Sequence, residues 1–403
     1  MKHRLLALLL AAGLTLSLCA CGDPAADSST DPSASPSADA SAAPSDEIQV
    51  DLTQALLPFA AGIEADDTAL TVNGQAVPAD LFLYWLALNC ASFEQYAMYY
   101  GMTVADYADQ LLQDSVTMTA YYVLLEQRAL EEGCPLTDEQ LAQIQEDLTA
   151  NGQETYDNQK TLFGLTDETM EFIFSVTQYY DNLLNALTAA PTQDELNNYV
   201  YQAKHILLLT VDMEGTPTLQ EDGTYAYPSL DEATIAEKRA LADDLLAQLR
   251  ASDDPAALFD ELMNEYSEDT GLESNPDGYT ATQGQMVPEF EETALALDFG
   301  EISDVVESSY GYHIILRGEV EDLDSYSDQY RQEQLEPQID QWLEESQVTP
   351  AEAVENLDVA DFYAKYTAWQ AAMAEQLQVE SGADASASPD PSASPAQSDS
   401  AGE

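Results

Sequence analysis

Two short apolar runs interrupt a chain that is otherwise patterned for helices, at residues 205–210 and 312–316. Each run is bounded by turn-forming residues, which is typical of a buried strand. Between the runs, apolar residues recur at helical spacing over 242–249, Pro opens a helix over 255–266, and a shorter apolar stretch covers 295–299. We therefore expect one small β-α-α-α-β module.

Helical patterns flank this module on both sides. Apolar and aromatic residues recur at helical spacing over 81–100, 118–129 and 172–186 before it, and over 335–342 and 362–373 after it. Helices on both sides of a small α/β module indicate an inserted domain. The expected fold class is therefore α+β, with the module placed between N- and C-terminal helical segments.

Local signals mark several element boundaries. Thr137 with Gln140 and Thr192 with Glu195 both have the spacing of a capping box, which opens a helix. The Asn73-Gly74 pair lies in a short strand-turn pattern, and Asn-Gly favours a tight turn between two strands. We expect a hairpin at the start of the folded region and helices that begin after residues 137 and 192.

Both ends of the chain have a composition that does not fold. Residues 22–47 and 380–403 consist mainly of Ala, Ser, Pro and Asp and hold no aromatic residue. Such segments cannot bury enough apolar surface to offset the entropy lost on ordering. We expect the first to be a disordered tether and the second a disordered tail.

The first 20 residues have the pattern of an export signal. Lys2 and Arg4 give a positive start, and residues 5–18 form an uncharged, Leu-rich run that is too short to span a membrane. The following Leu18–Cys21 segment resembles a bacterial lipobox, in which the last Cys is lipidated. Cys21 is therefore the expected lipidation site; the alternative is an ordinary secretory signal cleaved nearby.

The charge of the chain excludes several classes of partner. It has 75 acidic and 11 basic side chains, a formal net charge of −64. Nucleic acid is excluded because binding its phosphates requires clustered Lys and Arg, and a basic lipid-binding patch is disfavoured for the same reason. Beyond the leader, the only His residues are His205 and His313, and Cys90 and Cys134 are either paired or separate buried thiols.

The stretch from Ala203 to Arg317 resembles the parvulin-type peptidyl-prolyl isomerase domain. Five segments in the same order make the resemblance specific, whereas any one alone would be weak. These segments are Lys204–Leu207, Tyr266–Asp269, Gly284–Phe290, Gly300–Ser303 and Tyr310–Ile315.

The lipobox, the helical segments and the inserted module together look like the PrsA lipoprotein foldases and the related SurA chaperones. Outside the module, this likeness lies in the architecture more than in motifs. It implies the following organisation: a signal peptide over 1–20, a tether over 21–47, a helical chaperone domain over 48–200, an isomerase domain over 201–318, C-terminal helices packing on the helical domain over 319–379, and a tail over 380–403.

The chemistry implied by this resemblance needs no bond to break. Rotation about an X-Pro amide faces a barrier of ~18–20 kcal/mol, and a catalyst must bind the twisted amide better than either planar form. Neither a nucleophile nor a metal or other cofactor is needed. An apolar slot for the proline ring and a few polar groups around the amide suffice.

The resemblance assigns these roles to six residues. It implies that His205, Asp269 and His313 are the catalytic residues, with Asp269 beside the substrate carbonyl. It further implies that Met286 and Phe290 line the proline pocket, on a helix edge, with Tyr310 at its rim. The residues themselves leave structural alternatives open: buried His side chains that only shape the sheet, a solvated acidic loop, and ordinary core residues.

Two departures from the family pattern bear on substrate binding. Ala281 stands where the family has an aromatic residue, which implies a shallower proline pocket. The loop over 213–229 holds no Arg or Lys, so that a phosphoserine-proline preference is not expected.

The expected function is that of a foldase anchored by lipid to the outer face of a bacterial cell membrane, which isomerises X-Pro bonds in newly secreted polypeptides. The alternative is a holdase that binds unfolded chains and carries a weak or inactive parvulin module. A solute-binding lipoprotein is disfavoured because the sequence lacks a pair of large α/β lobes. A homodimer formed through the helical domain is a further expectation from this likeness, and the sequence itself leaves the oligomeric state open.

Overall fold

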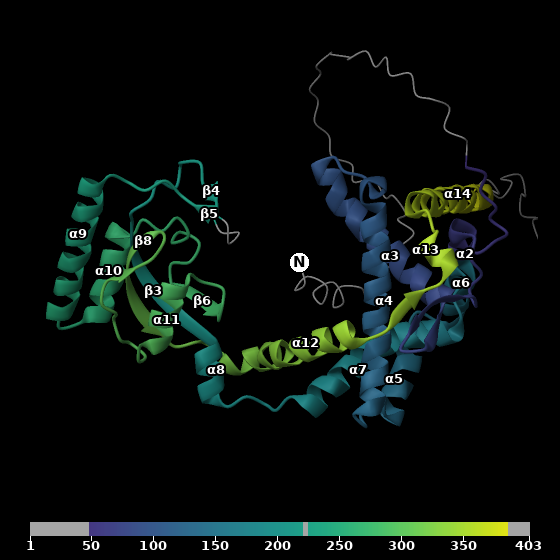
Figure 1. Cartoon of the computed structure of the whole chain (residues 1–403), viewed down its shortest axis with the longest axis horizontal. Coiled ribbons are helices and arrows are strands. Elements are labelled where there is room, and N and C mark those ends of the chain that lie inside the picture. Colours follow the sequence, from purple (N-terminus) through teal and green to yellow (C-terminus); the bar gives the residue numbers. More distant parts are fainter. Residues whose placement is uncertain (1–47, 221–224, 386–403) are drawn as a thin grey trace, which may run out of the picture. The chain divides into compact units, whose positions relative to one another are not determined.

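The computed structural model describes residues 48–220 and 225–385 (Figure 1). The expected signal peptide, the lipidation site Cys21 and the expected tether lie outside the described residues. Helix α14 (Val359–Ala385) continues past residue 380, where we expected the tail to begin. In the part that the structure describes, no helix combines the length and apolar character needed to cross a bilayer.

The described chain divides into two compact units. One unit contains residues 184–340, and the other contains the described residues before 184 and after 340. An α/β unit is therefore inserted between N- and C-terminal helical segments, and the expected fold class is confirmed. Helices α7 (Asp167–Leu187) and α12 (Ser327–Glu345) contain the two boundaries between the units.

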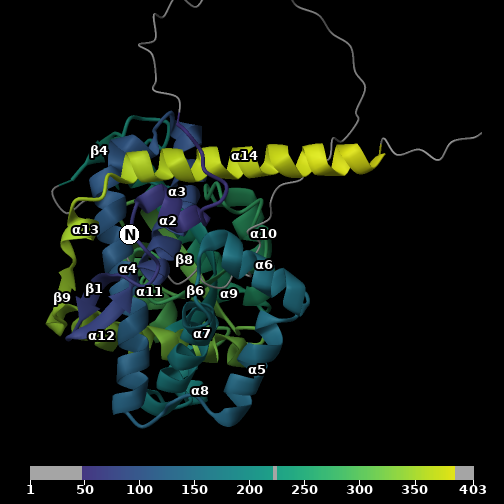
Figure 2. The same ribbon diagram turned by 90° about the vertical axis from the view of Figure 1, so that its right-hand side faces the viewer.

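The first unit is mainly helical, with residues from both ends of the described chain in its core. Phe362 and Trp369 of α14 are buried, and the Trp369 indole Nε1–H donates to the Gln54 carbonyl oxygen at 3.2 Å. Helix α14 packs along α2 and also contacts α3 and α4 (Figure 2). The helices of this unit other than α7, α12 and α14 are α2 (Leu56–Ala61), α3 (Ala79–Tyr100), η2 (Val104–Tyr107), α4 (Ala108–Glu131), α5 (Asp138–Leu148), α6 (Gln153–Phe163) and α13 (Glu352–Glu355).

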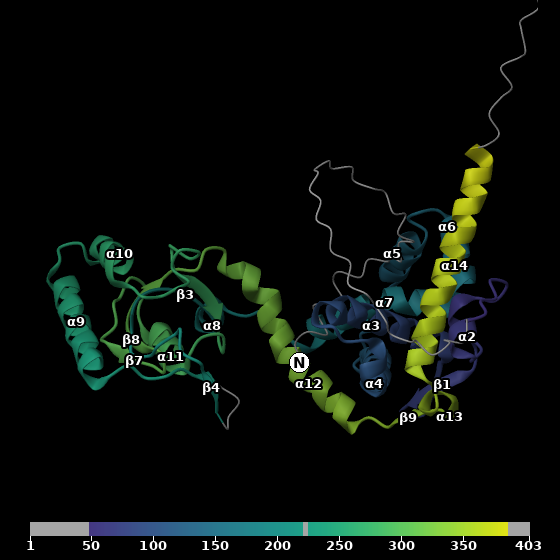
Figure 3. The same ribbon diagram turned by 90° about the horizontal axis from the view of Figure 1, so that it is seen from above.

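A three-stranded sheet also joins the two ends within this unit. Strand β1 (Thr68–Val72) lies between β2 (Gln75–Pro78) and β9 (Val348–Pro350), and both pairings are antiparallel. Figure 3 shows β9, from the C-terminal part of the chain, next to β1. The expected Asn-Gly turn connects β1 to β2, with φ of 52° at Asn73 and 85° at Gly74. The expected capping box at Thr137 is also present and opens α5.

The second unit is built on a four-stranded antiparallel sheet in the order β6-β3-β8-β7. Strands β3 and β8 are the expected pair and form its centre. The unit also has a two-stranded β4-β5 hairpin. The elements are α8 (Gln193–Tyr199), β3 (Val200–Leu209), β4 (Thr218–Leu219), β5 (Tyr225–Ala226), α9 (Glu232–Ala251), α10 (Pro255–Tyr266), β6 (Tyr279–Thr282), α11 (Pro288–Ala296), β7 (Val306–Glu307), β8 (Gly311–Gly318) and η3 (Leu323–Tyr326).

The expected β-α-α-α-β order was incomplete. Strands β6 and β7 are absent from it because they are four and two residues long and lack an apolar run. Strand β3 also begins five residues earlier than expected, because α8 ends at Tyr199 and Val200 already has extended backbone angles. The capping box expected at Thr192 is present and opens α8.

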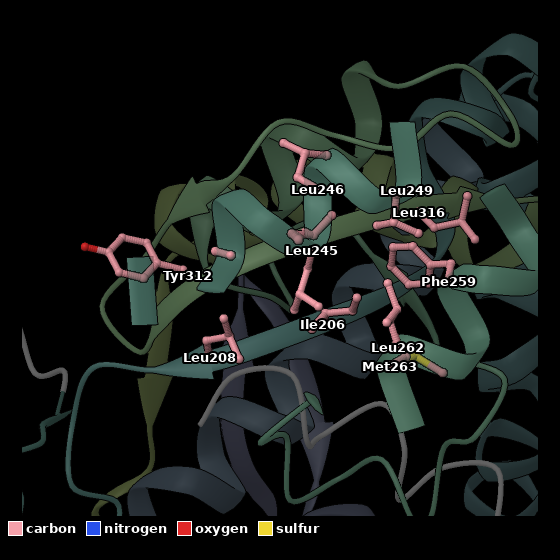
Figure 4. Packing of buried hydrophobic residues seen from close by; sticks show 12 residues of the cluster. Ile206, Leu208, Leu245, Leu246, Leu249, Phe259, Leu262, Met263, Tyr312 and Leu316 are labelled. Carbon is pink, nitrogen blue, oxygen red and sulfur yellow. The ribbon is translucent and has the colours of Figure 1, made fainter. Parts of the chain in front are cut away.

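One face of this sheet packs on α9 and α10 (Figure 1). Alternate residues of a strand point to the same face, and Ile206 and Ile314 lie in the same buried cluster as Leu245, Leu249 and Phe259. Figure 4 shows this cluster, with the side chains of α9 and α10 directed toward the sheet.

The opposite face packs on α11. Tyr201, Ala203 and Ile315 form a second cluster with Phe290 and Ala294. His205 and His313 continue the odd-numbered positions of β3 and β8, and the two-residue period of a strand therefore places both imidazoles on the α11 face.

The second unit is larger than the expected isomerase domain of 201–318. Helix α8 packs against the chain that follows β8, where Leu196 and Tyr199 contact Val320 and Tyr330. The Tyr199 hydroxyl donates to a carboxylate oxygen of Glu333 at 2.5 Å. Residues 184–200 and the first part of α12 therefore belong to the α/β unit.

Candidate functional site

A cavity of about 320 Å³ opens on the α11 face of the sheet. All six residues that the sequence singled out for the site line it. They are His205, Asp269, Met286, Phe290, Tyr310 and His313. The structure therefore brings together residues that are spread over more than 100 positions of the chain, while their individual roles remain predictions.

The two histidines form the floor of the cavity as a stacked pair. The Nδ1 atoms of His205 and His313 lie 3.1 Å apart. The ring planes are 11° from parallel, and the ring centroids are 5.3 Å apart. His205 stands opposite Ile315, and His313 stands opposite Leu207, so that the pair is a diagonal contact across two antiparallel strands.

A loop after α10 brings Asp269 to His205. Strand β6 covers one edge of β3 only as far as Ala203, and the loop covers the edge beyond it. The Leu207 amide donates to the Ser267 hydroxyl at 3.1 Å, and the Glu268 amide donates to the Leu207 carbonyl at 2.7 Å. The Leu209 amide donates to a Glu268 carboxylate oxygen at 2.8 Å. These bonds fix the loop along the strand edge, and Asp269 follows directly.

Three donors converge on the Asp269 carboxylate. His205 Nε2 lies 3.0 Å from Oδ2, the Tyr279 hydroxyl donates to Oδ2 at 2.6 Å, and the Gly271 amide donates to Oδ1 at 2.9 Å. The bond with His205 is the main reason that the pKa of Asp269 lies well below its ordinary value, although partial burial opposes this shift. Asp269 is therefore a carboxylate at neutral pH.

His313 is held neutral at the other end of the pair. Burial and, to a smaller extent, the nearby His205 lower the pKa of its imidazole to about 3, although Asp269 opposes this shift. Its Nε2 lies 2.7 Å from the Ser308 hydroxyl oxygen, which accepts from the Tyr310 amide at 3.1 Å.

When both imidazoles are neutral, these contacts permit one consistent arrangement of protons. An ionised Asp269 requires His205 Nε2 to donate, and the Nδ1 of a neutral His205 is then an acceptor. His313 must therefore donate from Nδ1 and accept at Nε2 from the Ser308 hydroxyl. The network assigns a single direction to a chain of hydrogen bonds that ends on the Asp269 carboxylate.

An apolar wall faces this polar floor. The Phe290 ring is 3 % exposed and meets both imidazoles edge-on, with centroid distances of 5.2 Å to His205 and 5.7 Å to His313. Met286 lines the same wall. We expected Met286 and Phe290 on one helix edge, but only Phe290 lies in α11: Pro288 opens the helix, and Met286 precedes it.

Ala281 lies behind this wall and not in the cavity. It is buried in the cluster that supports Phe290, and it is absent from the cavity lining. Tyr279, two residues earlier on the same strand, lines the cavity in its place. The structure thus gives no support for a pocket made shallower by Ala281.

Two residues of the site were missed by sequence reasoning. Tyr279 holds Asp269, and Ser308 holds His313. Tyr279 is positioned by β6, which was not expected, and its pKa is raised to about 12, mainly by burial and then by its bond to Asp269. Ser308 lies in the turn before β8, and a Ser in a turn carries no signal of its own.

The arrangement combines a rigid polar floor, a fixed negative charge and an apolar wall. Such a cavity can hold a small apolar ring against Phe290 and present the Asp269 carboxylate to a neighbouring amide. Because every polar group of the floor is already hydrogen-bonded, its geometry is set before a ligand arrives.

Comparisons with known proteins identify the domain that contains this cavity. Residues 205–319 match the family model described as Rotamase: PPIC-type PPIASE domain. The chain therefore carries a parvulin-type peptidyl-prolyl isomerase domain, as expected from its motifs.

Curated relatives match a part of the chain. A foldase protein PrsA of Halalkalibacterium halodurans is 33% identical over 152 residues, which are 34% of this chain and 44% of that protein. A chaperone SurA of Thiobacillus denitrificans is 37% identical over 112 residues, 28% of this chain and 26% of that protein. Each match thus spans less than half the length of the relative.

Solved structures include similar chains. A crystal structure of a peptidylprolyl isomerase (PrsA) from Bacillus cereus aligns with 76% of this chain and 99% of its own, at 18% sequence identity and a TM-score of 0.33.

Proposed function

We propose that this protein is a foldase that catalyses the cis–trans isomerisation of X-Pro bonds in newly secreted polypeptides. The observation that carries the proposal is the pairing of the Asp269-His205-His313 hydrogen-bonded floor with the Phe290 wall in one cavity. The similarity to foldase PrsA and chaperone SurA sequences supports polypeptides as the substrate class.

In the proposed mechanism, the cavity binds the twisted amide better than either planar form. The proline ring packs against Phe290 and Met286, and the amide lies over the histidine floor. Rotation removes the conjugation between the carbonyl and the imide nitrogen, so that the carbonyl oxygen loses part of its negative charge. The Asp269 carboxylate repels that partial charge in the planar forms and therefore favours the twisted one. Each tenfold increase in rate requires that the cavity bind the twisted amide about 1.4 kcal/mol more favourably than the planar forms.

A holdase activity is the second candidate, because the helical unit has an exposed aromatic cluster. At the end of α3, Tyr99 is 86% exposed and Met98 is 70% exposed, and Tyr96 and Tyr100 are also exposed. Few charged side chains accompany them in this stretch of the helix. An exposed patch of this kind is typical of a surface that binds other polypeptides.

A refolding experiment separates the two candidates. The chain from residue 48 onward is added to an unfolded protein whose slow refolding phase is limited by a trans-to-cis prolyl step. A foldase shortens that phase at substoichiometric amounts, and Asp269→Ala removes the effect. A holdase leaves the phase unchanged and suppresses light scattering only at stoichiometric amounts. Suppression without acceleration would therefore reject the foldase proposal.

The proposed location is the outer face of the bacterial cell membrane, with a lipid on Cys21 as the anchor. The lipobox resemblance of Leu18–Cys21 supports it, and two or more acyl chains suffice for stable anchoring. Cys21→Ser is expected to release the protein from the membrane fraction into the medium, whereas Cys90→Ser is expected to leave it bound. Retention of the Cys21→Ser variant would contradict the anchor.

A homodimer formed through the helical domain is the proposed assembly, on the strength of the family resemblance alone. Sedimentation equilibrium of the chain from residue 48 onward tests it. A dimer mass that persists after deletion of the α/β unit, residues 184–340, is expected, and a monomer at micromolar concentration would contradict the assembly.

A further inference from the structure

The cavity continues beyond the residues that the proposed reaction uses. Leu209 lies four residues past His205 on β3, about 13 Å further along the strand, and it lines the cavity together with Met213 and Tyr310. A proline ring held against Phe290 leaves this end open to the side chain of the residue that precedes the proline. Leu209, Met213 and Tyr310 present apolar surface to that side chain.

The charged side chains that line the cavity are acidic. Glu268 and Asp269 are both part of the lining, and no Lys or Arg of the described residues is. Asp269 is hydrogen-bonded to His205, and Glu268 forms an ion pair with Lys238. The charge of Glu268 is therefore largely neutralised by Lys238. The charge at the open end of the cavity comes from other groups.

Two further carboxylates stand beside this open end. Asp212 and Glu214 flank Met213 in a tight turn, in which the Gly215 amide donates to the Asp212 carbonyl at 3.1 Å and the Glu214 amide donates to Asp212 Oδ1 at 3.0 Å. Both residues are exposed. In the described part of the chain, no Lys or Arg forms an ion pair with either of them.

The backbone positions of Asp212 and Glu214 are each about 4 Å from that of Met213. An extended Asp or Glu side chain adds about 4–5 Å, so that both carboxylates lie within about 9 Å of the Met213 Cα atom. This distance is close to the Debye length of about 8 Å at physiological ionic strength. A basic side-chain head group next to Met213 is attracted by the two uncompensated carboxylates, and an acidic head group there is repelled by them.

Resting on the proposed isomerase function, we infer that this cavity selects prolyl bonds preceded by Lys or Arg. The aliphatic stem of such a residue packs on Leu209 and Met213, while its cationic head stays in solvent near Asp212 and Glu214. Acidic residues before the proline are disfavoured by the same charges. Asp212 and Glu214 are thus specificity-determining residues that lie outside the polar floor.

The test compares peptides that differ only in the residue before the proline. The full-length chain is assayed on acetyl-Ala-Xaa-Pro-Phe-amide, with Xaa as Lys, Leu or Glu, by exchange NMR between the cis and trans signals. These peptides carry no other charge. We expect kcat/KM to be about tenfold higher for Lys than for Glu at 20 mM salt, because two charges act at less than about 10 Å. The ratio should fall toward one at 0.5 M salt.

A matched pair of double variants locates the effect. Asp212→Asn with Glu214→Gln removes two negative charges beside the cavity and retains the acceptor oxygen at position 212. Asp253→Asn with Glu261→Gln removes two exposed charges of the same unit that do not line the cavity. The first pair should reduce the Lys-to-Glu ratio to about twofold, and the second pair should leave it unchanged.

The possible failures are distinguishable. Equal kcat/KM values for the Lys and Glu peptides, or a ratio that both double variants change alike, would overturn the inference and leave the isomerase activity standing. Acceleration of none of the three peptides would overturn the proposed function and this inference with it.

Discussion

The Nδ1 atoms of His205 and His313 lie 3.1 Å apart, although 108 residues separate the two positions in the chain. Facing nitrogens at this distance require one ring to donate and the other to accept. When both rings are neutral, the carboxylate of Asp269 decides which ring donates, because it accepts the proton on His205 Nε2. A single ionised side chain thus fixes the orientation of the polar floor as far as Ser308.

Tyr279→Phe tests the support of that carboxylate. The change removes the hydroxyl that donates to Asp269 Oδ2 at 2.6 Å and keeps the ring. Hydrogen bonds to charged groups contribute about 1.5–3 kcal/mol, and the pKa of Asp269 should rise toward its ordinary value. We expect a several-fold loss of isomerase kcat/KM, together with a lower free energy of unfolding of the α/β unit, because the same bond stabilises the fold. An NMR titration of the Asp269 carboxyl carbon checks the pKa, and an unchanged titration would contradict the assigned contact.

Ser308→Ala tests the other end of the network. The variant leaves the buried Nε2 of His313 without its hydroxyl partner and the Tyr310 amide without its acceptor. An unsatisfied buried polar group costs about 1–3 kcal/mol, so the free energy of unfolding of the α/β unit should fall by that amount. Ser309→Ala, at an exposed neighbouring position, should change it by less than about 0.5 kcal/mol. Equal effects in urea denaturation would argue against the role of Ser308.

Acid should weaken the α/β unit through His313. Its folded pKa of about 3 lies below its ordinary value of 6.5, because burial disfavours the charged ring. Between these two pH values the unfolded chain binds a proton that the folded chain does not, and stability therefore falls as pH decreases from 6.5. The loss is about 2 kcal/mol at pH 5. Asp269, with a lowered pKa, adds a further loss below pH 3.8.

Hydrogen exchange measures this loss locally. The amides of β3 and β8 report the opening of the sheet, and their protection should decrease between pH 7 and pH 5 after correction for the intrinsic rate. His313→Gln should remove most of that dependence. Protection that stays constant in the wild-type protein would contradict a buried neutral His313.

Much of the fold and of the site could be predicted from the sequence, because the structural elements concerned are specified by local patterns. The capping boxes at Thr137 and Thr192, the Asn73-Gly74 turn and the apolar runs of β3 and β8 each depend on neighbours within a few residues. The family resemblance placed six residues, and all six line one cavity.

Long-range pairing explains what the sequence did not determine. Strand β6 is specified by its contact with β3: Gly278, with φ of 85°, lies so close to the Ala203 carbonyl that an added Cβ would stand 2.5 Å from its oxygen. No sequence pattern within residues 279–282 predicts this pairing. The role of Tyr279 in the site was therefore not predicted either. The association of α8 with η3 and α12 was missed for the same reason, because it joins residues more than 100 positions apart.

The most direct test of the central claim is prolyl exchange in a small peptide, where no chaperone effect contributes. Exchange NMR on acetyl-Ala-Leu-Pro-Phe-amide compares the chain from residue 48 onward with its Asp269→Ala variant, whose fold is checked by the chemical shifts of β3 and β8. The account predicts cis–trans exchange that is faster than the uncatalysed reaction, which takes tens to hundreds of seconds. It also predicts that kcat/KM of the variant is lower by at least about tenfold. Wild-type protein that leaves the exchange at its uncatalysed rate, or a folded variant as active as the wild type, would contradict the claim that this cavity twists a prolyl amide.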